Sequence, residues 1–245
     1  MEKGVVKSVN ILLVGERYSP NLGDGVIFNT VEAMICQEFP GANIFGIDLS
    51  GRVTYCDDTD WLMTGWQSFV SKNISANTAR ALLVKKQLNK ILDSQEIDVI
   101  IFVGGQLFMD YFSWSILTIV KQAQNRNIPV IFNSCGFGNN SFSGQKRIQK
   151  ALSIPVVSAL SLRDQAGYLA GVLPQHIDTV MATDPVVELG KYWKNCHQDK
   201  KNRKKLRIGI NIMSPWTTHK ENPETTRSEE RRVGKECRSR WSPYH

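Results

Sequence analysis

The sequence lacks the patterns that would place it in several common classes of protein. Its five cysteines are scattered and form no CxxC pair, which argues against a structural zinc site or a disulfide framework and favours a reducing compartment. No apolar run approaches the roughly 18 residues of a membrane-spanning helix. The first apolar run is too short for a signal peptide, because the charged residues Glu16 and Arg17 end it. We therefore expect a cytoplasmic protein, with peripheral attachment at the inner face of the membrane as the alternative.

Standard nucleotide-binding signatures are also missing. Gly15 follows the first apolar run, but the next glycines are Gly23 and Gly25. This spacing does not give the GxGxxG fingerprint of dinucleotide-binding proteins, and no GK[ST] triplet of a Walker loop occurs. The loop after the first strand is therefore neither of the two standard nucleotide loops, and we expect no cofactor and no metal.

The last nineteen residues, RSEERRVGKECRSRWSPYH, differ in character from the rest. They hold six Arg or Lys and three Glu, and so account for +3 of the formal net charge of +7. Residue for residue they resemble the translated read-through of a common sequencing adapter. We expect residues 227–245 to be a non-native tail and the open reading frame to be a fragment of a longer protein. A genuine basic tail that binds nucleic acid is the alternative.

Apolar runs of strand length alternate with segments of helical periodicity. The strand candidates are 10–15, 43–49, 98–104, 128–134 and 156–161. The helix candidates are 26–38, 78–93, 114–127 and 145–152. Runs such as DVIIFVGG are apolar throughout, which is typical of strands buried on both faces of a parallel sheet. The alternation predicts an α/β fold with a doubly wound, mostly parallel, Rossmann-like sheet.

Composition divides the chain further. We expect residues 1–190 to form a first Rossmann-like domain and 57–76 to form a loop with a short helix over the sheet edge. Residues 191–206 are rich in lysine and predict a basic linker, with a nucleic-acid or phosphate patch as the alternative. The run LRIGINIMSPW at 206–216 begins a new buried-strand pattern, so residues 207–226 are expected to start a second α/β domain.

In open parallel sheets, ligands bind at the carboxyl ends of the strands, where helix N-termini present free N–H groups. The first such loop is GERYSPNLGDGVI, in which Asn21 and Asp24 suit either turn-and-cap chemistry or contact with a sugar hydroxyl. The second loop holds the pair Gly104 and Gly105, which lets the backbone approach a ligand or cross the sheet closely. A third loop contains Cys135, which we interpret as a buried structural thiol, with a nucleophile as the alternative.

Two further strand ends carry charged residues. In SLRDQAGYL, Arg163 offers a planar guanidinium suited to a carboxylate or phosphate. An ion pair with Asp164, or a pair between domains, is the structural alternative. In ATDPVVEL, Asp184 lies near the end of the last strand before the linker and therefore near an expected interdomain cleft.

Taken together and in order, NLGD, GGQLF, SLRD and ATDPV resemble the motifs of the polysaccharide pyruvyl transferase family. The resemblance extends over about residues 9–212. One departure is visible, because the family commonly has a glycine triplet where this chain has Gln106 after its glycine pair. The resemblance implies the N-terminal half of a two-domain fold like that of the glycosyltransferase-B enzymes, with two Rossmann-like halves facing across a cleft.

The resemblance also implies a reaction. Phosphoenolpyruvate would donate its pyruvyl group to two hydroxyls of a sugar, or of a lipid-linked glycan acceptor, as a cyclic ketal. By this reading Arg163 holds the donor anion, and Asn21 and Asp24 contact the acceptor or order the loop. The catalytic residues are expected in the second half, from which the family takes a histidine and an arginine, so we expect the 245-residue chain to be inactive. The alternatives are a nucleotide-sugar glycosyltransferase of the same fold and an inactive anion-binding module.

Overall fold

The computed structural model describes residues 8–55, 75–163 and 177–192. The chain divides into two compact units, Met1–Gln198 and Asp199–His245, and all described residues lie in the first. The predictions for 57–74, for Asp164, for most of the basic linker, for the start of the second domain and for the tail lie outside the described residues. No helix in the described part is long and apolar enough to cross a membrane.

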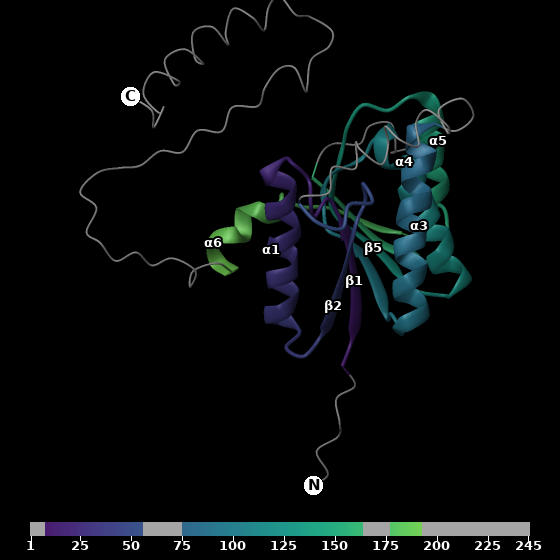
Figure 1. Cartoon of the computed structure of the whole chain (residues 1–245). Helices are drawn as coiled ribbons and strands as arrows, with labels where there is room; N and C mark the ends of the chain where they lie inside the picture. The colour runs from purple at the N-terminus through teal and green to yellow at the C-terminus, as the bar shows by residue number, and fades with distance from the viewer. Residues whose placement is uncertain (1–7, 56–74, 164–176, 193–245) are drawn as a thin grey trace, which may run out of the picture. The chain divides into compact units, whose positions relative to one another are not determined.

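A parallel sheet forms the centre of the first unit (Figure 1). Its strands are β1 (Asn10–Gly15), β2 (Asn43–Asp48), β3 (Val99–Phe102), β4 (Gly105–Phe108), β5 (Val130–Phe137), β6 (Val157–Leu162) and β7 (Asp178–Met181). They run in the order β2-β1-β3-β5-β6-β7, with β4 pairing β5, and every pairing is parallel. The expected α/β fold with a parallel Rossmann-like sheet is confirmed.

Helices cover both faces of this sheet. They are α1 (Leu22–Glu38), α3 (Ala76–Ser94), α4 (Asp110–Asn125), α5 (Phe142–Leu152), the 3-10 helix η1 (Pro185–Glu188) and α6 (Leu189–Tyr192). Figure 1 shows α1 on one side of the sheet and α3, α4 and α5 on the other. The short helices η1 and α6 pack against α1. Successive side chains of β1 point to opposite faces of the sheet. Leu13 therefore packs in the core beneath α1, whereas Leu12 and Val14 pack in the larger core on the opposite face.

The order of the strands places a topological switch point between β1 and β3. From β1 the chain first crosses to β2 on one side and later enters β3 on the other side. In doubly wound sheets the crevice at the carboxyl ends of two such strands is the usual position of a ligand.

A glycine pair interrupts the strand that enters this crevice. Gly104 and Gly105 have φ angles of +107° and +91°, which L-residues with a side chain rarely adopt. They separate β3 from β4, and both strands pair with the same neighbour, β5. The sequence pattern predicts a strand at 98–104 and places Gly105 and the residues after it in a loop. This interpretation was wrong, because the glycines turn the backbone sharply and let it resume pairing with Cys135 and Phe137.

Candidate active site

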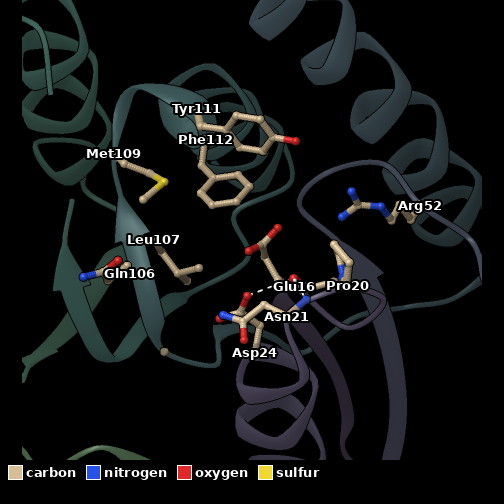
Figure 2. A pocket seen from close by; sticks show the side chains of 12 residues that line it. Glu16, Pro20, Asn21, Asp24, Arg52, Gln106, Leu107, Met109, Tyr111 and Phe112 are labelled. Carbon is tan, nitrogen blue, oxygen red and sulfur yellow. Dashed lines mark hydrogen bonds between the residues drawn. The ribbon is translucent and has the colours of Figure 1, made fainter. Parts of the chain in front are cut away.

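A pocket of about 320 Å³ lies at the switch point, at the carboxyl ends of β1 and β3. The loop after β1 contributes Glu16 and Asn21 to its lining, and the first turn of α1 contributes Asp24. Gly104, which lies between β3 and β4, also lines the pocket. Figure 2 shows Glu16, Asn21 and Asp24 together on one side of the pocket, across from the aromatic side chains at the start of α4. The two loops that come first in the chain therefore form one site, as the sheet topology requires.

Asn21 and Asp24 hold the start of α1 in place. Asn21 is the N-cap of this helix, and its side-chain oxygen accepts a hydrogen bond from Gly23 N at 3.2 Å. Asp24 lies in the first turn and accepts a hydrogen bond from Ser19 Oγ at 2.9 Å. The hydroxyl of Ser19 in turn accepts from Asn21 N at 3.1 Å. The capping role expected for Asn21 is confirmed, and both residues also line the pocket.

Glu16 is a functional candidate that sequence reasoning did not select. Its side chain lines the pocket, and Ser50 Oγ donates a hydrogen bond to its Oε1 at 2.8 Å. The pKa of Glu16 is raised from 4.5 to about 7, chiefly by burial and also by the charge of Asp24 and a hydrogen bond with that carboxyl. A hydrogen bond between two carboxyl groups requires that one of them carries a proton. Glu16 is therefore a carboxylic acid poised to exchange a proton near neutral pH.

Hydrogen bonds to Asp48 anchor the backbone behind this pair. Asp48 is 1% exposed and accepts hydrogen bonds from Tyr18 N at 2.7 Å and Ser50 N at 2.8 Å. Burial raises the pKa of Asp48, and the two backbone N–H groups oppose that rise. These bonds tie the loop after β1 to the end of β2. They therefore hold Glu16 and Ser50 close enough for the hydrogen bond between their side chains.

One cation and two aromatic rings complete the pocket. Arg52 is the basic residue among the described lining residues, and Tyr111 and Phe112 form the opposite wall (Figure 2). Their rings meet edge to face at 4.7 Å. The guanidinium of Arg80 lies over the ring of Tyr111, with Cζ 3.4 Å from the ring centroid, and holds that ring by a cation–π contact. Burial lowers the pKa of Arg80.

The other predicted site residues lie apart from this pocket. Gly105 begins β4 and is not among the lining residues of the pocket. Arg163 follows β6, and its Nη1 lies 2.5 Å from Asp184 Oδ2. Asp184 also accepts from Val186 N at 3.0 Å and so caps η1. Neither residue lines the pocket, but both follow parallel strands and therefore share its edge of the sheet.

Cys135 belongs to the core. Its side chain is fully buried, and burial raises the pKa of its thiol well above the usual range. Its Sγ lies 3.6 Å from Asn133 O. A thiol that stays protonated and inaccessible is a poor nucleophile, so the structure favours the buried structural thiol over the nucleophile. Among the described residues, no group of three or more His, Cys, Asp or Glu is placed to hold a metal ion.

The fold is that of an α/β protein with a parallel Rossmann-like sheet, and it has a pocket at the switch point of that sheet. Comparison with known families then identifies the chain more closely. The sequence model of the polysaccharide pyruvyl transferase family matches residues 21–236, and the chain belongs to this family. The match begins at Asn21 of the NLGD motif, within the pocket. No curated protein and no solved structure matches the chain.

Proposed function

We propose that this protein is a polysaccharide pyruvyl transferase that moves the pyruvyl group of phosphoenolpyruvate onto a sugar of a cell-surface glycan as a ketal. Family membership supports a transferase of this kind. The observation that carries the proposal is the pocket itself, because the family motifs NLGD and GGQ meet there beside a carboxylic acid whose pKa is about 7. Addition of a hydroxyl to an enol phosphate needs proton transfer in both directions near neutral pH.

In this proposal the donor anion is held at Arg163. The guanidinium stands at the carboxyl end of β6, and its ion pair with Asp184 fixes its orientation. Neighbouring strands lie about 4.8 Å apart, so Arg163 and the pocket, separated by β3 and β5, are roughly 10–15 Å apart along one edge of the sheet. That separation allows phosphoenolpyruvate and a sugar to lie side by side, with the donor toward the arginine and the acceptor toward the carboxyl groups.

The test is turnover with defined products. Phosphoenolpyruvate is incubated with candidate glycan acceptors, and the mixture is examined for release of phosphate together with a pyruvyl ketal on the sugar by mass spectrometry. The 245-residue chain and a chain continued past Thr226 with the downstream genomic sequence are compared in parallel. Under the proposal, the extended chain forms the ketal and the 245-residue chain does not. Transfer of a glycosyl group from a nucleotide sugar, without ketal formation, would instead establish the glycosyltransferase alternative.

A further inference from the structure

We propose that the switch-point pocket is the subsite for the acceptor sugar, and that Glu16 transfers the proton between the attacking hydroxyl and the methylene carbon of the donor. The role of Glu16 rests on the proposed function, because it needs phosphoenolpyruvate as donor. The binding of a sugar does not rest on it and can be tested by itself.

The size of the pocket suits a single sugar ring. Its volume of about 320 Å³ lies at the low end of the range of about 300–1,000 Å³ found for small-molecule sites. A nucleotide sugar or a long glycan would extend well beyond it. A terminal sugar residue, with the rest of the acceptor outside, is the ligand that matches this volume.

The chemistry of the walls also favours a neutral polyol. Glu16 and Asp24 present oxygen acceptors to hydroxyl groups, and Ser19 ties Asp24 in position at 2.9 Å. On the opposite side, Tyr111 offers apolar ring surface to the C–H face of a sugar, and the buried Phe112 packs against that ring edge to face (Figure 2). Tyr111 is 36% exposed, so a ligand can reach its ring. Arg80 of α3 contacts the same ring through its guanidinium and holds it in place.

The same walls disfavour the donor. Phosphoenolpyruvate carries a carboxylate and a phosphate, and the one negative charge that Glu16 and Asp24 carry between them when Glu16 is protonated would repel both. Arg52 is the cation among the described lining residues, and the negative charge of Asp24 in the same pocket offsets its positive charge. The uncharged methylene end of the donor is the part that can approach these carboxyl groups.

Glu16 is placed to serve both reacting groups. In its protonated form one carboxyl oxygen accepts the proton of the attacking hydroxyl while the other gives its own proton to C3 of the donor. The hydroxyl oxygen forms a bond to C2, and the π electrons of the C2=C3 bond form the new C–H bond, so C3 becomes a methyl group and Glu16 is again protonated. When the second hydroxyl bonds to C2, the C2–O bond to phosphate breaks, and the proton of that hydroxyl leaves with the phosphate.

Binding is tested on the 245-residue chain. Backbone amide spectra of the ¹⁵N-labelled protein are titrated with the methyl glycosides of galactose, mannose and glucose, and separately with phosphoenolpyruvate. At least one glycoside should shift the amides of the pocket, and phosphoenolpyruvate should not displace it. Tyr111→Ala should abolish these shifts, whereas Phe142→Ala, which removes an exposed ring on α5, should keep them. Shifts confined to other regions, or equal shifts in Tyr111→Ala, would overturn the subsite.

The role of Glu16 is tested in the form of the protein that makes the ketal. Glu16→Gln should lower turnover by about 100-fold or more while sugar affinity stays within about threefold, because glutamine keeps the shape but cannot relay a proton. The control is Glu38→Gln, which changes an exposed residue at the end of α1. Wild-type turnover should fall as pH rises through about 7, the pKa of Glu16.

Other charged groups face Glu16 and could also contribute to the pH dependence of turnover. They are Asp24 of α1, Asp48 at the end of β2 and Arg80 of α3, with Arg52 in the same pocket. Only Glu16→Gln should remove the fall in activity above about pH 7. Equal turnover in Glu16→Gln and Glu38→Gln would overturn the proton role and leave the transferase standing. If no preparation forms the ketal, the proposed function fails and the proton role fails with it, while the sugar titration still decides the subsite.

Discussion

The guanidinium Nη1 of Arg163 lies 2.5 Å from Oδ2 of Asp184. The contact joins two sequence motifs, SLRD at the end of β6 and ATDP after β7, which come close because these two strands pair in parallel. Both side chains are partly exposed, at 21% and 30%. An ion pair of this kind adds little stability in water, so its main effect is to orient the arginine at the edge of the sheet where the donor is proposed to bind.

Arg163→Ala should reduce turnover far more than stability. The loss of one charge-assisted contact to the donor should cost roughly 2–4 kcal/mol of transition-state stabilisation, or about 30- to 1,000-fold in kcat/KM. The free energy of unfolding should fall by about 1 kcal/mol or less. Arg163→Lys should recover little activity, because an ammonium lacks the planar two-pronged geometry. Both quantities are measured on the same preparation, by ketal formation and by urea unfolding.

The control for Arg163 is another ion pair in the same unit. Arg126→Ala removes a contact of 2.6 Å to Asp93 that is formed between α3 and the end of α4. It should lower stability by a similar amount and leave turnover unchanged. An Arg163→Ala protein that is as active as Arg126→Ala would show that the pair is purely structural.

Gly104 should tolerate alanine much less well than Gly41 does. Both glycines have strongly positive φ angles, +107° and +99°. A Cβ at Gly104 would lie 2.9 Å from Asn133 O, whereas a Cβ at Gly41 would meet nothing within 4 Å. Gly41→Ala should therefore cost about 1–2 kcal/mol of backbone strain, and Gly104→Ala about 3 kcal/mol or more, because the backbone of β5 must also shift.

Urea unfolding of the two variants measures this difference directly. Gly41→Ala isolates the cost of the dihedral angle, and the excess in Gly104→Ala gives the cost of the close approach. Equal costs would mean that β3, β4 and β5 can separate without penalty at this point, which contradicts the tight crossing that shapes one side of the pocket.

Much of the fold could be predicted from the sequence. The limits of β1 match the expected 10–15, because a continuous apolar run is bounded by polar residues on both sides. Helix α1 begins at Leu22, four residues before the expected start. Residues 22–25 include two glycines and an aspartate and show no helical periodicity, but the Asn21 cap compensates for them. The short strands β4 and β7 carry too few residues to give a pattern of their own.

The site was predicted only in part. Asn21, Asp24 and Gly104 meet in the pocket because they follow strands that end at the switch point. Glu16 was read merely as the end of an apolar run, although a charged residue directly after a buried parallel strand is itself a signal. The partner of Arg163 was expected to be Asp164 or a residue of another domain. Asp184 is 21 positions away, and only the β6–β7 pairing brings it close.

Cys135 should resist alkylation in the folded protein while Cys36 reacts. Cys135 is fully buried with a raised thiol pKa, and Cys36 is exposed on α1. Native protein is treated with iodoacetamide at mildly alkaline pH, and peptide mass spectrometry then gives the extent of labelling at each site. Cys135 should become labelled only after addition of denaturant. Rapid native labelling of Cys135, together with loss of turnover, would restore the nucleophile interpretation.

Removal of residues 227–245 should leave the first unit unaffected. These residues belong to the second compact unit and resemble translated adapter sequence, although the family match continues to residue 236. The truncated and complete chains are compared by thermal unfolding, and their Tm values should agree within about 1 °C, since a change of 1 kcal/mol would shift Tm by about 2–4 °C in a chain of this size. A drop of several degrees would contradict the adapter interpretation.

Glu16→Gln should stabilise the protein at alkaline pH relative to the wild type, and not at acidic pH. The pKa of Glu16 is raised from 4.5 to about 7 in the folded state by burial and by Asp24, so the folded protein binds more protons than the unfolded chain between these values. The contribution of Glu16 to the free energy of unfolding is therefore highest below about pH 4.5 and is lost as pH rises through about 7. Glutamine is neutral at every pH, so the Glu16→Gln protein does not lose this stability as the pH rises.

The measurement is urea unfolding of both proteins at about pH 5 and about pH 8, where the linkage predicts that the difference in stability shifts by about 2 kcal/mol in favour of Glu16→Gln. Glu38→Gln again serves as the control, because an exposed glutamate should give the same difference at both pH values. If the difference in free energy of unfolding between Glu16→Gln and the wild type were the same at both pH values, Glu16 would be ionised in the folded protein as it is in water. The pocket would then lack the carboxylic acid on which the proposed proton transfer depends, even if the sugar still binds there.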